Sequence, residues 1–172
     1  MSSAADATIP EQPNVVLINA GTNDCIQNYN VSTAHERMRS LVEKLFAEIP
    51  GTTVVLSTLL PNAVDSVDER VDSVNEKFRE LVATLSSSGS PAEGAEGQRI
   101  VLAEMNNGYI TRDELVEDGI HPNKEGYNKM AARVSFFRLL VLELLCCMLG
   151  RRGLTLGQHS GTKSSSPRPR TA

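Results

Sequence analysis

Tryptophan is absent from this sequence, and aromatic residues account for only 4% of its 172 positions. Aliphatic side chains must therefore build any core, and an apolar content of 40% is enough for one domain of ordinary size. The scarcity of aromatic residues also argues against a surface that stacks the bases of single-stranded nucleic acid.

Acidic residues are absent from the last part of the chain. Residues 151–172 contain five basic residues and no acidic one, whereas residues 1–150 contain 12 basic and 21 acidic residues, a net charge of −9. An acidic body repels nucleic acid and anionic membranes. We therefore expect no nucleic-acid partner, and a small neutral substrate is the easier one to bind.

Cysteine is scarce as well. The three cysteines, Cys25, Cys146 and Cys147, are too few for a disulfide framework and lack metal-ligand spacing. The cysteine spacing therefore predicts no metal site. The chain also has no glycine-rich loop that could bind phosphate, which disfavours a flavodoxin-like nucleotide binder, and we predict no cofactor. The first residues do not resemble a signal peptide, and localisation stays unknown. The apolar run 136–149 contains Arg138 and Glu143 and is shorter than the ~20 residues of a membrane span.

Apolar periodicity predicts strands that alternate with helices. Three short apolar runs are the predicted strands: 14–20, 53–58 and 99–105. Two longer segments with apolar residues at helical spacing are the predicted helices: 32–49 and 67–85. This order indicates an α/β fold, a three-layer α/β/α arrangement with a parallel sheet and right-handed crossovers.

The remaining segments set the predicted boundaries. We predict a disordered lead-in at 1–12, one domain at 13–149 and a disordered basic tail at 150–172. Thr33 and Glu36 have the spacing of a capping box at the start of the first long helix. Pro122 suits the first turn of a closing helix.

Two groups of polar residues follow predicted strands and could carry chemistry. Asp118 and His121 lie on a loop after the third strand, where a carboxylate could hold an imidazole in one tautomer for general acid–base catalysis. Gly21 allows a sharp turn after the first strand, and the Asn23 amide could stabilise an oxyanion. Taken alone, an Asp-x-x-His pair is more often a solvated loop or a helix cap, and the group that begins at Gly21 could as well be a plain strand-to-loop turn.

Together, the two groups resemble the SGNH hydrolases, also called GDSL lipases and esterases. The stretch VVLINAGTNDC resembles their third motif block and DGIHPNKEGYNKMA their fifth. Within the superfamily, residues 13–132 look most like carbohydrate esterase family three, microbial and fungal enzymes that remove acetyl groups from xylan. The resemblance implies a serine hydrolase of small-molecule or polysaccharide esters, with catalytic His121 and Asp118 and with Asn23, beside Gly21, on the oxyanion and substrate-binding side.

The sequence also departs from that family. It contains no Gly-Asp dipeptide and no Gly-x-Ser-x-Gly elbow, so the nucleophilic serine of the first block is absent, as is the oxyanion glycine of the second. The family's sheet order implies that the strand at 14–20 lacks a neighbour and has an open, apolar edge. Ser57 and Cys25 are possible substitutes, but a polar residue facing a helix and a small buried thiol are the expected roles.

Two hypotheses therefore remain. The chain is part of a truncated esterase whose nucleophile comes from a missing segment, or it is a non-catalytic remnant that binds carbohydrate or a partner through the old active-site cleft. The stretch after Val134 does not resemble the closing helix of the family. An apolar strand that ends in Gly-Asp-Ser, encoded in frame upstream of Met1, would favour the first hypothesis.

Overall fold

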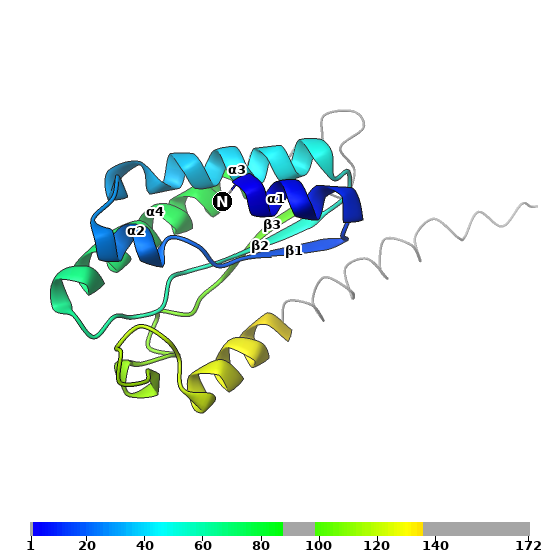
Figure 1. The fold of residues 1–172 in the computed structure, drawn as a ribbon. Helices are drawn as coiled ribbons and strands as arrows, with labels where there is room; N and C mark the ends of the chain where they lie inside the picture. The colour runs from blue at the N-terminus through cyan, green and yellow to red at the C-terminus, as the bar shows by residue number, and fades with distance from the viewer. Residues whose placement is uncertain (1, 88–98, 136–172) are drawn as a thin grey trace, which may run out of the picture.

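A three-stranded parallel sheet lies at the centre of the protein. The computed structural model describes residues 2–87 and 99–135. Strands β1 (Val15–Ile18), β2 (Thr53–Ser57) and β3 (Arg99–Ala103) pair in the order β1-β2-β3, and both pairs are parallel (Figure 1). The predicted strands and the predicted α/β fold class are thus confirmed.

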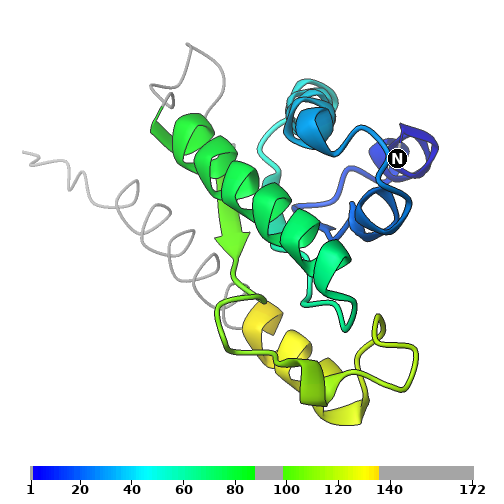
Figure 2. The same ribbon diagram turned by 90° about the vertical axis from the view of Figure 1, so that its left-hand side faces the viewer.

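Helices cover both faces of the sheet. The elements are α1 (Ser2–Thr8), η1 (Ile9–Glu11), α2 (Thr22–Gln27), η2 (Val31–Thr33), α3 (Ala34–Glu48), α4 (Asp65–Ser87), η3 (Arg112–Glu114) and a further helix over residues 124–135. Helices α1, α3 and α4 lie on one side of the sheet, and the helix over 124–135 lies on the other (Figures 1 and 2). The molecule therefore has the predicted three layers.

The core follows the predicted apolar stripes. Every residue of β2 is buried, as expected for the central strand of a sheet that is covered on both faces. One cluster joins the strands to the first helical layer, with Met38 and Val42 from α3 and Val71 and Phe78 from α4. A second cluster packs the opposite face of the sheet against the helix over 124–135, through residues that include Met130.

The prediction that residues 1–12 are disordered is wrong for residues 2–11, which form α1 and η1. Their anchors come from far along the chain. Ala5 is buried, Lys44 of α3 pairs with Asp6, and the Gln12 side chain donates a 3.0 Å hydrogen bond to the carbonyl oxygen of Glu48. These contacts with α3 stabilise the helical structure of the segment, and amino-acid composition alone does not reveal them.

Three local predictions also need correction. The predicted polar loop after β1 turns at once into α2, with Gly21 at its N-cap. The capping box at Thr33 does not form, because the Thr33 hydroxyl donates to the carbonyl oxygen of Asn30. The closing helix begins at residue 124 rather than at Pro122, because Asn123 caps it by accepting hydrogen bonds from two backbone N–H groups.

The predicted disordered tail at 150–172 and the apolar run at 136–149 lie outside the described residues. Within the described part of the chain, no helix is both long enough and apolar enough to cross a bilayer.

Candidate active site

The Asp118–His121 pair lies on a closed loop between η3 and the helix over 124–135. An antiparallel bridge between Leu115 and Pro122 closes this loop. The backbone N–H of Val116 donates to the carbonyl oxygen of His121 at 2.8 Å, and Asn123 N–H donates to the carbonyl oxygen of Glu114 at 2.7 Å. Both catalytic candidates are thus held on one short turn with a fixed backbone.

Asp118 holds the imidazole of His121 directly. Its Oδ2 lies 2.6 Å from Nδ1 of His121, and its Oδ1 accepts the backbone N–H groups of Ile120 and His121 at 2.8 and 2.9 Å. The hydrogen bond from the backbone of His121, then its imidazole, then the backbone of Ile120 lower the pKa of Asp118 to about 2. Asp118 is therefore a carboxylate at neutral pH.

This contact determines what the imidazole can do. A carboxylate only accepts hydrogen bonds, so Nδ1 of neutral His121 must carry the proton and Nε2 has the free lone pair. The His121 side chain is 66% exposed, and no hydroxyl or thiol within residues 2–87 and 99–135 is hydrogen-bonded to it. The His121 side chain is thus held through Nδ1 and accessible to solvent.

Gly119 fits the loop against the segment that follows β2. Its φ is +68°, a left-handed conformation that favours glycine. The backbone N–H of Ala63 donates to its carbonyl oxygen at 2.9 Å, and a Cβ at position 119 would lie 2.4 Å from Cβ of Ala63. This close approach requires glycine between Asp118 and His121.

Arg112 ties the same loop to the start of α4. Its two terminal nitrogens bind Asp65 and Asp68 at 2.8 and 2.7 Å. Asp68 also accepts the backbone N–H of Asn62 at 2.7 Å, so one carboxylate fixes both the loop after β2 and the segment before Asp118. On the other side, Lys129 pairs with Glu114. Sequence reasoning missed Arg112, because nothing local relates it to acids more than 40 residues away.

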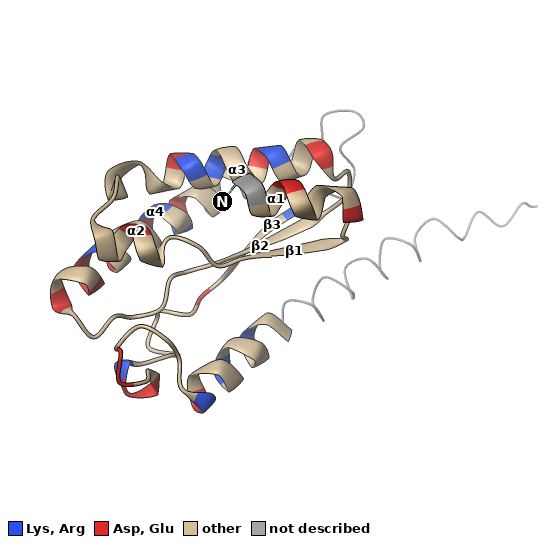
Figure 3. Ribbon diagram, in the orientation of Figure 1, with Lys and Arg blue, Asp and Glu red and all other residues tan. Residues whose placement is uncertain are grey.

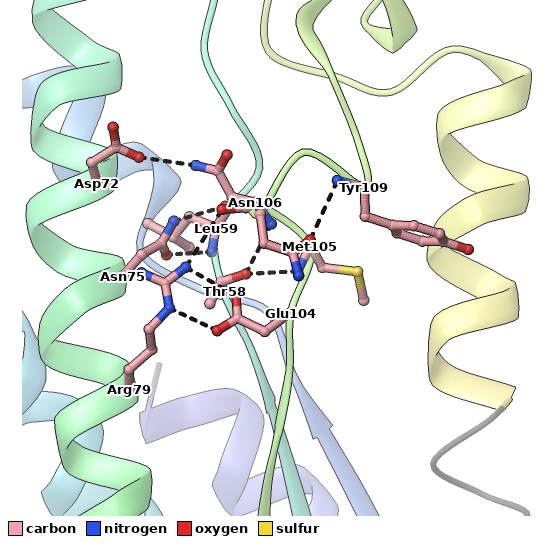
Figure 4. A network of polar contacts seen from close by, with 10 residues as sticks. Thr58, Leu59, Asp72, Asn75, Arg79, Glu104, Met105, Asn106 and Tyr109 are labelled. Carbon is pink, nitrogen blue, oxygen red and sulfur yellow. Dashed lines mark hydrogen bonds and ion pairs between the residues drawn. The ribbon is translucent and has the colours of Figure 1, made fainter.

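A polar network fixes the ends of β2 and β3 (Figure 4). The buried Asn75 side chain binds both the N–H and the carbonyl oxygen of Leu59 at 2.7 and 3.0 Å. The Thr58 hydroxyl accepts the N–H of Met105 at 2.8 Å, while Arg79 forms two hydrogen bonds with the carboxylate of Glu104. These contacts hold the loops that lead into the candidate site.

Gly21 and Asn23 lie directly after β1. Gly21 has a φ of +129°, which confirms the predicted sharp turn, and Asn23 lies exposed in the first turn of α2. Asp24 fixes this helix by pairing with Arg37 of α3 at 2.8 Å. Figure 1 shows that the segments after β1 and after β3 leave the sheet at the same end. Convergence of Asn23 with the Asp118–His121 pair remains a prediction, since no hydrogen bond within the described residues joins them.

Neither substitute nucleophile is suited to the role. Ser57 is buried, and its hydroxyl donates to the carbonyl oxygen of Ile18 and accepts from the Asn19 amide at 2.7 Å, so it links β1 to β2. Cys25 has no exposed surface, and burial, aided by Asp24 and opposed by Arg70, raises the pKa of its thiol to about 11. Cys25 has the expected role of a small buried thiol. Ser57 is structural too, but its hydroxyl binds residues at the end of β1 instead of facing a helix as expected.

Comparison with known proteins places these features in a family. The model of the GDSL-like Lipase/Acylhydrolase family matches residues 4–134. A multidomain esterase of Ruminococcus flavefaciens is 26% identical over 119 residues, which are 69% of this chain and 14% of that protein.

Solved structures share the fold. A family 3 carbohydrate esterase from Talaromyces cellulolyticus aligns with a TM-score of 0.68 and 21% identity, over 81% of this chain and 64% of that one. A family 3 carbohydrate esterase from Clostridium thermocellum aligns with a TM-score of 0.67 and 19% identity, over 84% of this chain and 65% of that one. The chain thus spans less than two thirds of each of these three relatives. It belongs to the GDSL-like lipase and acylhydrolase family.

Proposed function

We propose that this chain supplies the base, the orienting acid and one oxyanion donor of an SGNH-type carboxylic ester hydrolase that removes O-acetyl groups from carbohydrate. The observation that carries the proposal is the 2.6 Å contact between Oδ2 of Asp118 and Nδ1 of an exposed His121. That contact leaves Nε2 free to take a proton from a hydroxyl. The names of the family 3 carbohydrate esterases that share the fold support the substrate class.

The chemistry assigns one step to each residue. Nε2 of His121 accepts the proton of a serine hydroxyl as its oxygen attacks the ester carbonyl carbon. The Asn23 side-chain N–H, beside the turn at Gly21, donates to the oxygen that becomes negative. Asp118 keeps the imidazole in place and stabilises it once it is protonated, and His121 then returns the proton to the leaving alcohol.

The nucleophile belongs, in this proposal, to a segment outside this sequence. Ser57 is committed to the link between β1 and β2, and the Cys25 thiol is protonated at neutral pH. A triad that lacks its nucleophile loses on the order of a millionfold in turnover. The 172-residue chain by itself should therefore hydrolyse esters negligibly.

Hydrolysis of p-nitrophenyl acetate tests the proposal. The purified chain should be inactive, and a fusion that adds an apolar strand ending in Gly-Asp-Ser ahead of Met1 should be active. His121→Ala in the fusion should abolish activity, while His35→Ala, on α3, serves as the matched control.

Two results would count against the proposal. If the unmodified chain is active and Ser57→Ala or Cys25→Ala abolishes that activity, the nucleophile is not missing. If the folded fusion stays inactive, the chain is better described as a non-catalytic binding remnant of the fold.

A further inference from the structure

The connection between α2 and α3 presents a tyrosine to solvent. Tyr29 lies between Asn28 and Asn30, and its side chain is 58% exposed. Both asparagines have a left-handed backbone, with φ of +51° and +44°, which asparagine tolerates better than most residues. The backbone N–H of Tyr29 donates to the carbonyl oxygen of Asp24 at 2.8 Å and so ties the turn to α2. The exposed ring is therefore carried by a turn with a defined backbone.

An anchored arginine supports the Tyr29 ring. The guanidinium carbon of Arg37 lies 5.8 Å from the centre of the ring, a distance at which the cation and the ring attract each other. Arg37 itself donates hydrogen bonds to three groups: Oδ2 of Asp24 at 2.8 Å, the hydroxyl of Thr33 at 3.0 Å and the carbonyl oxygen of Asn30 at 3.1 Å. Because its support is held in place, the ring should lose little freedom when a ligand binds.

The surface around Tyr29 is polar but uncharged. Residues 25–35 include no Asp, Glu, Lys or Arg, and Figure 3 shows the connection from α2 to the start of α3 in tan. Residues 27–30, here called the amide turn, are all exposed and add three side-chain amides to the ring: Gln27, Asn28 and Asn30. Each amide can both donate and accept hydrogen bonds. An aromatic ring beside neutral amides suits a ligand that has an apolar face and uncharged hydroxyl groups.

The amide turn follows the helix that carries Asn23. Helix α2 begins directly after Gly21, and its six residues span about 9 Å. In Figure 1 the connection between α2 and α3 lies at the same end of the sheet as the segments that follow β1 and β3. An oligosaccharide can extend from Asn23 to the amide turn, whereas a single acetyl group cannot.

We propose that the amide turn binds one sugar unit of a neutral oligosaccharide, with the Tyr29 ring as its platform. A pyranose ring has a face of C–H groups that packs on an aromatic ring, and its hydroxyl groups exchange hydrogen bonds with amides. The substrate class rests on the function proposed above, and the amide turn lies outside the residues to which that function assigns a chemical step. A sugar unit held at Tyr29 keeps a neighbouring unit of the same chain near Asn23.

Titration of the isotope-labelled full chain with xylohexaose, followed by NMR, tests this site. We expect saturable shifts of the backbone amides of residues 27–30 and of the side-chain amides of Asn28 and Asn30. Tyr29→Ala should weaken binding about tenfold or more, whereas Tyr29→Phe keeps the ring and should change the affinity by less than about threefold. Added sodium chloride should leave the affinity unchanged, because the sugar is uncharged.

Two matched variants separate binding from folding. Asn28→Gly removes one amide but readily adopts the left-handed backbone, so the fold should persist while binding weakens about threefold or more. Tyr127→Ala removes a tyrosine of similar exposure, 54% against 58%, from the helix over 124–135 and should leave binding unchanged. Circular dichroism confirms that each variant is folded before binding is measured.

The outcomes separate this site from the proposed function. Absence of saturable shifts at the solubility limit of xylohexaose, or equal affinity of Tyr29→Ala and the unmodified chain, would overturn the sugar site even if a fusion that supplies the nucleophile is active. Binding that Tyr29→Ala weakens would uphold the site, and an inactive fusion would then refute the esterase function alone. In an active fusion, Tyr29→Ala should raise KM for acetylated xylohexaose and leave hydrolysis of p-nitrophenyl acetate unchanged. An equal loss with both esters would contradict a role in sugar binding.

Discussion

Replacing Gly119 by alanine should disturb both the stability of the protein and the candidate site. Two effects add at this position. The left-handed φ of +68° costs an alanine about 1–2 kcal/mol. The new Cβ would lie 2.4 Å from Cβ of Ala63, and overpacking of that kind costs about 1–3 kcal/mol more. We therefore expect Gly119→Ala to lower the free energy of unfolding by about 2–5 kcal/mol.

Gly108 provides the matched control for this prediction. Its φ is +83°, but a Cβ there meets nothing within 4 Å, so Gly108→Ala isolates the conformational cost of about 1–2 kcal/mol. Adding Ala63→Gly to Gly119→Ala removes the clash. The double variant should therefore regain the part of the free energy of unfolding by which Gly119→Ala costs more than Gly108→Ala.

Urea unfolding followed by circular dichroism measures each free energy, provided that the m value stays constant. Equal costs for Gly119→Ala and Gly108→Ala, with no coupling to Ala63→Gly, would refute the close packing of the two loops.

Three further predictions follow from the electrostatics and burial of single side chains. The pKa of Asp118 is about 2 in the folded protein and higher in the unfolded chain. Its contribution to stability should therefore be present above pH 4 and disappear as the pH falls towards 2. Asp118→Asn should remove this part of the acid dependence of the free energy of unfolding in urea titrations. Cys25 should resist iodoacetamide in the native protein and react after unfolding, as peptide mapping can show, and rapid native labelling would contradict its burial. Asn75→Ala leaves the N–H and carbonyl of Leu59 unpaired in the core and should cost about 2–4 kcal/mol in unfolding experiments, whereas a cost near zero would mean that water replaces the amide.

Local sequence patterns predicted the three strands and the two long helices because the apolar residues that give the patterns also form the core. The strands around Val16, Val54 and Ile100 are short runs of β-branched residues, and all three form where they were expected. The long helices follow their apolar stripes to within two residues of the predicted limits. In these elements local propensity and tertiary burial favour the same structure.

Prediction failed where a distant partner decides the local structure. Residues 2–11 are helical through contacts of Asp6 and Gln12 with α3, more than 30 residues away in sequence. The Thr33 hydroxyl is bound to the Asn30 carbonyl and to Arg37, so the predicted cap competes with contacts that spacing does not show. The local structure at residues 2–11 and at Thr33 therefore depends on contacts that form only in the assembled fold.

The geometry of the candidate site depends partly on local sequence spacing and partly on contacts between residues that are distant in the sequence. The Asp118–His121 contact spans three residues, so sequence spacing alone could predict it. The position of that pair relative to the sheet depends instead on Ala63 and Arg112, which join the loop to the segment after β2 and to the start of α4. We expect a substitution that loosens either contact to leave the pair intact but to move it relative to Asn23. On the proposed function, an active fusion with such a substitution should keep the low pKa of Asp118 and lose turnover, because the proposed base and the proposed oxyanion donor must reach the same ester.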